Sequence, residues 1–166
     1  MTLADGLITW LHLICASIWV GGSIFLGIVL SPMLRTITKT VEERIIIMIK
    51  VGRRFNKIAI PSFAILILTG LYSSRPFFQQ PNTLFETTYG LILIIKIILV
   101  IVTLTAYILH IKVLSTKTEN RIATGNMNNI YLQFVRSKII ILGRIIVILS
   151  LAILLLAALL DSGGIY

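Results

Sequence analysis

Four ionisable side chains interrupt the long apolar runs of this sequence. They are His12, Lys96, His110 and Arg144. Burying such a group near the centre of a bilayer costs about 2.5–3.5 kcal/mol on insertion scales, so it normally faces protein and has a task. Histidine is the commonest metal ligand and also holds haem iron, a neutral lysine amine can coordinate a metal, and arginine pairs with carboxylates. The four residues are therefore candidates for binding a metal or a cofactor.

The apolar runs that carry these residues are long enough to cross a membrane, which takes about 20 residues. We predict four spans, at about 6–34, 58–75, 87–112 and 138–161. Pro32 is expected to close the first span, and the amphipathic stretch 41–55 to continue the second helix into the headgroups. The sequence thus predicts an all-α integral membrane four-helix bundle, with residues 1–166 forming a single transmembrane domain.

The composition agrees with a membrane protein. Hydrophobic residues make up 57% of the 166 residues and charged residues only 13%, whereas soluble domains carry about a quarter charged residues. This excludes a soluble enzyme, a disordered tail and a disulfide scaffold, and the single Cys15 excludes an internal disulfide.

Basic residues set the expected orientation. Twelve Lys and Arg residues fall in 35–57 and in 112–138, whereas Arg75 alone lies at the other ends of the spans. By the positive-inside rule, the segments 35–57 and 113–137 are cytoplasmic and both termini extracytoplasmic. Residues 116–129 are expected to form a solvated loop with a short helical tail. We expect a multi-pass cell-membrane protein. Its net charge of +9 is expected to interact with the headgroups of the lipid bilayer and not with nucleic acid.

Depth along the spans separates the candidates into two levels. With a rise of about 1.5 Å per residue, His12 and Lys96 each lie roughly 7–8 Å inside the extracytoplasmic boundary. His110 lies about 21 Å deeper than Lys96 and near the level of Arg144. His12 and Lys96 can therefore meet, whereas His12 and His110 are too far apart to bind one metal ion.

The helix face of His12 admits two interpretations. Cys15 and Trp19 share this face, and Gly22 lies close by. Small residues let a neighbouring helix approach closely, in which case Trp19 is a packing residue, but they also leave room for a flat macrocycle beside His12. The simpler alternatives are a hydrogen bond from His12 to a hydroxyl, snorkelling of Lys96, and interfacial positions for His110 and Arg144.

Four stretches resemble the copper resistance protein D (CopD) family and the related HemJ-type protoporphyrinogen oxidases. They are WLHLICASIWVGG at 10–22, RRF at 53–55, LTGL at 68–71 and GLILIIK at 90–96. The specific part of this resemblance lies in His12, Trp19, Gly21, Gly22, Gly70 and Lys96. In the HemJ-type enzymes, a histidine of the first helix and a lysine of the third are implicated in haem binding, so the resemblance implies haem b at His12 with Lys96 nearby.

The leading functional hypothesis is a haem b membrane redox protein for electron transfer or an oxidoreductase reaction. Iron would be held by His12 and Lys96 beside Trp19 and Gly22, with Tyr72 or Arg75 near the propionates. His110 could serve a second, weaker site, and Arg144 could pair with a carboxylate of the bound group. Electron transfer would need a quinone or a redox partner protein, and the small-residue faces are compatible with a homodimer.

Two alternatives remain open. The first is copper uptake or resistance, in which His12 and Cys15, three residues apart, form half of a copper site. The sequence shows few polar residues that could carry an ion between His12 and His110. The second alternative is a porphyrinogen oxidase, and the sequence leaves open whether the protein is an enzyme.

Overall fold

The computed structural model describes residues 2–79, 85–124 and 128–161, and every regular element in these ranges is helical. Four helical stretches are long and apolar enough to cross a membrane: Leu3–Ile37, Val41–Arg75, Thr88–Ala123 and Ile130–Asp161. Over the described residues, the prediction of an all-α protein with four helices able to span a membrane is therefore confirmed. The extracytoplasmic position of the termini stays a prediction from the charge asymmetry.

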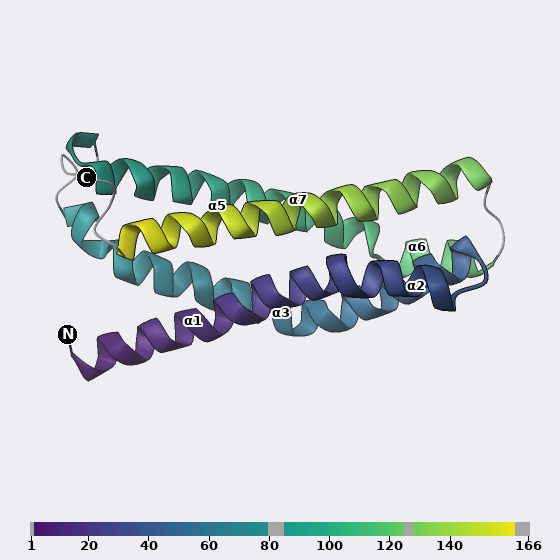
Figure 1. Ribbon diagram of the computed structural model, residues 1–166, viewed down its shortest axis with the longest axis horizontal. Coiled ribbons are helices and arrows are strands. Elements are labelled where there is room, and N and C mark those ends of the chain that lie inside the picture. Colours follow the sequence, from purple (N-terminus) through teal and green to yellow (C-terminus); the bar gives the residue numbers. More distant parts are fainter. Residues whose placement is uncertain (1, 80–84, 125–127, 162–166) are drawn as a thin grey trace.

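The helices lie side by side as two antiparallel pairs (Figure 1). Helix α1 (Leu3–Ile24) packs chiefly on α3 (Val41–Gln79), and α5 (Thr88–Val113) packs chiefly on α7 (Asn129–Asp161). Helix α1 begins and α7 ends at the same end of the bundle (Figure 1). We call this the terminal end, and the opposite end, with the segments rich in Lys and Arg, the basic end.

Pro32 does not close the first span, contrary to the prediction. After α1 the helix continues as a π-helical turn, η1 (Phe25–Leu30), and then as α2 (Ser31–Ile37). Proline lacks an N–H and its ring clashes with the carbonyl four residues earlier. A π turn shifts the hydrogen-bond register at that point, so the helix passes through the proline with a local distortion.

The second basic segment contains a helix where a loop was expected. Helix α6 (Thr116–Ala123) begins at Ser115, whose side chain accepts a hydrogen bond from the backbone N–H of Thr118. Its buried Glu119 lies 2.6 Å from the Arg53 guanidinium of α3. These contacts hold α6 on α3, and the polar composition that suggested a loop belongs to its exposed face. Residues 125–127 of the expected loop lie outside the described residues.

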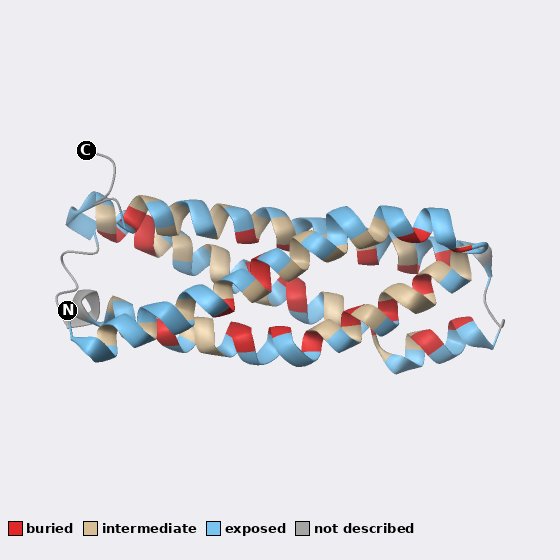
Figure 2. Ribbon diagram, turned by 60° about the horizontal axis from the view of Figure 1, so that its bottom comes forward, coloured by how far each residue is buried: buried red, intermediate tan, exposed pale blue. Residues whose placement is uncertain are grey.

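Among the described residues, buried side chains occur along the whole length of the bundle (Figure 2), in three apolar clusters. The central cluster joins all four spans through aromatic and small side chains: Trp19, Val20, Ala59, Phe63, Ala106, Tyr107 and Ile146. Large apolar side chains cover the outside, among them Leu68, Ile148 and Leu155, each more than 60% exposed. Such an exterior suits acyl chains, because lipid does not penalise apolar surface as water does.

Candidate functional site

A cavity of about 370 Å³ lies in the terminal half of the bundle, between α1, α3, α5 and α7. Both His12 and Lys96 line it, so the structure brings together the two residues that helix geometry places at one depth. Ser74 and Ser150 add hydroxyls, and apart from Trp19 the other lining residues are apolar or glycine. We call this space the His12 cavity. Its size falls in the range of small-molecule sites, about 300–1,000 Å³.

A threonine of α3 fixes the tautomer of His12. The distance from His12 Nδ1 to Thr69 Oγ1 is 2.6 Å, and the same hydroxyl donates to the carbonyl of Ile65 at 2.7 Å. Because the hydroxyl has one proton and donates it to Ile65, it accepts from His12 Nδ1–H. The lone pair of His12 is then on Nε2, which is the form of imidazole that binds metals.

Lys96 enters the cavity from α5 without a polar partner among the described residues. Its side chain is half-buried, and the neighbouring residues Leu93 and Val100 that line the cavity with it are apolar. Its amine therefore faces the same space as His12. A protonated amine there opposes a bound cation, whereas a neutral amine offers a second nitrogen ligand.

Trp19 and Phe63 line the His12 cavity, and Tyr107 packs against both rings; we call these three rings the aromatic floor. The centroid of Trp19 lies 4.4 Å from that of Phe63 and 4.7 Å from that of Tyr107. Trp19 is 3% exposed, and its Nε1–H donates to Ser150 Oγ at 3.0 Å. Trp19 is thus a packing residue of the central core that also lines the His12 cavity.

A second cavity of about 340 Å³ lies beyond this aromatic floor, in the basic half. We call it the His110 cavity, because His110 lines it together with Arg144 and Arg35. Tyr107 and Asn56 also line it, and the Tyr107 hydroxyl donates to Asn56 Oδ1 at 2.9 Å. The two depth levels expected from the sequence thus correspond to two separate cavities.

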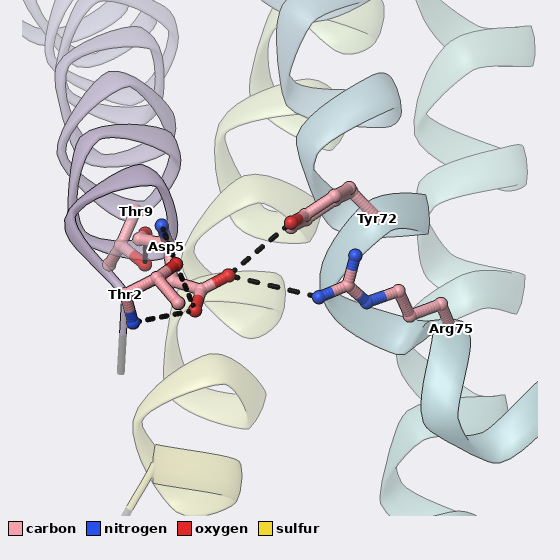
Figure 3. Close-up of polar contacts among 5 residues, drawn as sticks. All are labelled: Thr2, Asp5, Thr9, Tyr72 and Arg75. Carbon is pink, nitrogen blue, oxygen red and sulfur yellow. Dashed lines mark hydrogen bonds and ion pairs between the residues drawn. The ribbon is translucent and has the colours of Figure 1, made fainter.

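Three other candidates line neither cavity. Tyr72 donates to Asp5 Oδ1 at 3.3 Å, and the Arg75 guanidinium lies 3.8 Å from the same oxygen and over the Tyr72 ring (Figure 3). This contact joins α1 to α3 at the terminal end.

Gly22 lies against the Phe55 ring, with no room for a Cβ. This is the close helix contact that was one of the two interpretations of the small residues near His12.

Metal ligands are sparse. Among the described residues, no group of three or more His, Cys, Asp or Glu side chains could hold a metal ion. Cys15 is buried at 4% exposure, but it does not line the His12 cavity. The lining of the His12 cavity thus gives no support to a copper half-site formed by His12 and Cys15.

Several polar neighbours of the candidate residues were not predicted from the sequence. Thr69 fixes the His12 tautomer, Ser150 holds Trp19, and Asn56 is paired with Tyr107. Each is a polar residue within or beside an apolar span. This position could have predicted a structural role, because polar side chains in membrane helices form hydrogen bonds with neighbouring helices. Together they supply more polar groups between the two histidines than the sequence indicated.

Comparisons with known proteins identify the family. The model of the copper resistance protein D family matches residues 49–163, which include Lys96 and His110 but not His12. A relative from Bacillus subtilis (strain 168), named copper transport protein CutJ, is 33% identical over 90 residues, which are 54% of this chain and 16% of that protein. No solved structure matches the chain. The chain therefore belongs to the copper resistance protein D (CopD) family.

Proposed function

We propose that this multi-pass membrane protein takes part in copper uptake or resistance and that His12 is its main copper ligand. The family and the name of the B. subtilis relative support copper as the cargo. The observation that carries the proposal is the His12 imidazole, whose Nδ1–H is held by Thr69 so that its Nε2 lone pair can face the cavity.

The chemistry of this nitrogen suits copper. Imidazole is a good ligand for copper ions, and a hydrogen bond at the other ring nitrogen raises its basicity and orients the ring. The chain supplies few further ligands among the described residues, so copper would be held loosely enough to leave again. Weak binding suits a protein that passes its ion on.

The two cavities give a route for the ion along the bundle axis. The route would start at His12, pass the floor formed by Trp19, Phe63 and Tyr107, and reach the His110 cavity. The hydrogen bonds from Trp19 to Ser150 and from Tyr107 to Asn56 hold two of these rings in place. Passage would need these rings to move, as a gate between the cavities.

Copper uptake by cells or vesicles tests the proposal. His12→Ala should abolish copper-dependent uptake and lower copper binding to the purified protein by tenfold or more, roughly what loss of a main ligand implies. Cys15→Ser is the matched control, because Cys15 lies one turn along the same helix but does not line the cavity. Equal copper binding and uptake by His12→Ala and the unchanged protein would refute the proposal.

Lys96 gives a second test with an opposite sign for the two candidate ligands. If copper binds at His12 beside a protonated Lys96, Lys96→Leu removes a nearby cation and should tighten copper binding. If the cavity holds haem b with Lys96 as a ligand, the same change should weaken binding and alter the spectrum. Both residues line one cavity, so the substitution acts on either ligand directly.

Haem b is the second candidate, favoured by the apolar lining that His12 and Lys96 share. Haem would supply one-electron redox chemistry, while His12 would bind the iron and the apolar walls would exclude water. A Soret band in protein purified from haem-supplied cells, absent from His12→Ala, supports this candidate. A colourless protein that retains copper excludes it.

We also propose that the basic end faces the cytoplasm and both termini the outside. Twelve basic residues against one support this orientation. A reporter enzyme that works only in the cytoplasm should be active when it is fused into segment 35–57 or 113–137, whereas a reporter that works only after export should be inactive there. Export of a reporter placed in either segment would contradict the orientation.

A further inference from the structure

The His110 cavity is cationic, although most of it lies within the membrane-spanning helices. Arg35 of α2 and Arg144 of α7 line it together with His110 of α5. No Asp or Glu among the described residues lines the cavity, and neither arginine forms an ion pair with one of them. The cavity therefore holds positive charge without a counter-charge from the described protein.

The position of Arg144 favours a bound counter-charge. It follows the apolar run Ile139–Leu142, about 9 Å deeper along α7 than Lys138. A guanidinium stays charged at any relevant pH and is costly inside the membrane unless it is paired. Arg144 lies about one and a half turns or more inside Lys138, and its side chain, although exposed in the structure, lines the His110 cavity. We therefore expect its missing partner to be bound in that cavity.

The remaining polar groups of the cavity are mostly hydrogen-bond donors. Both arginines donate only, and the Asn56 amide keeps its N–H groups available because its oxygen accepts from Tyr107. His110 Nδ1 is buried and has no hydrogen-bond partner among the described residues. A group rich in acceptor oxygens would therefore match this lining in both charge and hydrogen bonding.

We propose that the His110 cavity binds a phosphate-bearing anion through the guanidinium groups of Arg144 and Arg35. Guanidinium forks match phosphate oxygens in a bidentate manner. Basic pockets between membrane-spanning helices bind the headgroups of anionic lipids, which makes a phospholipid phosphate one source and free phosphate the other. This site is distinct from the His12 cavity and does not depend on the proposed copper function.

Native mass spectrometry tests the lipid source. The protein in neutral detergent is offered phosphatidylglycerol or phosphatidylcholine, and the retained lipid is counted for the unchanged protein, Arg144→Gln and Lys138→Gln. Lys138→Gln is the matched control, because it removes the same charge from the same helix and Lys138 is exposed like Arg144, but Lys138 lies beside Phe134 and does not line the cavity. We expect phosphatidylglycerol affinity to fall roughly tenfold in Arg144→Gln and to stay unchanged in Lys138→Gln.

Thermal unfolding tests whether free phosphate in solution is the ligand. Inorganic phosphate, compared with chloride at equal ionic strength, should raise the melting temperature of the unchanged protein but not of Arg144→Gln if free phosphate is the ligand. Lipid retention without a phosphate effect assigns the site to a headgroup, and the reverse result assigns it to free phosphate. Absence of both effects, or equal losses in Arg144→Gln and Lys138→Gln, would overturn the proposal.

A second variant covers the case in which Arg144→Gln does not fold. Arg144→Lys keeps the charge but lacks the fork, so it should retain the fold and lose part of the phosphate or lipid affinity. Circular dichroism and a single size-exclusion peak establish folding for each variant. Unchanged affinity in both Arg144→Lys and Arg35→Gln would overturn the proposal as well.

Discussion

Two adjacent glycines of α1 should respond in opposite ways to the same substitution. A Cβ added to Gly22 would lie 2.5 Å from Phe55 Cζ and even closer to Phe55 Cε2. A Cβ added to Gly21 would meet nothing within 4 Å. Because carbon atoms are normally about 3.5–4.0 Å apart, the Phe55 ring must move by about 1 Å or more in Gly22→Ala.

The magnitude follows from two opposing contributions. Overpacking a contact of this kind costs about 1–3 kcal/mol, and replacing glycine by alanine inside a helix stabilises it by about 0.5–1 kcal/mol. Gly21→Ala should therefore stabilise the protein by about 0.5–1 kcal/mol, and Gly22→Ala should be about 1–3 kcal/mol less stable than Gly21→Ala. The Phe55 ring lines the His110 cavity. If the ring shifts into that cavity, the difference in stability between Gly22→Ala and Gly21→Ala should lie near the lower end of the range of about 1–3 kcal/mol.

Unfolding of the two variants in mixed micelles, followed by circular dichroism, measures this difference. Adding Phe55→Leu to Gly22→Ala should recover most of the lost stability, because the smaller side chain removes the clash. A double-mutant cycle isolates this coupling. The reasoning is refuted if Gly22→Ala is as stable as Gly21→Ala, or if Phe55→Leu rescues nothing.

The remaining predictions concern hydrogen bonds and one ion pair. Thr69→Val removes the acceptor of His12 Nδ1–H and should weaken copper binding by about 10–100-fold, whereas Thr69→Ser should keep it; competition with a coloured copper chelator measures both. Ser150→Ala leaves the buried Trp19 N–H without its partner and should lower the free energy of unfolding by about 1–3 kcal/mol, with a shifted tryptophan emission; an unchanged emission and stability would count against the contact. Glu119→Gln breaks the ion pair between α6 and α3 and should cost about 1 kcal/mol, less at high salt; a salt-independent loss would contradict the electrostatic explanation.

Parts of the site follow from the sequence because they depend on position along one helix. The equal depth of His12 and Lys96 came from counting residues, and both line one cavity. The loop expected at residues 116–123 was wrong because buried Glu119 and its contacts with α3 are non-local. Pro32 likewise does not end the first span, because a π turn accommodates it.

The sequence by itself predicted four helices able to cross a membrane and the relative positions of the ionisable groups along them. These properties add up residue by residue from transfer free energies and a constant helical rise. Only the tertiary structure decided how each helix is rotated against its neighbours. It paired Thr69 with His12, occupied Tyr72 and Arg75 with Asp5, and placed Phe55 against Gly22. Such contacts join residues from different helices, and their energies depend on the packing of side chains that no single apolar run specifies.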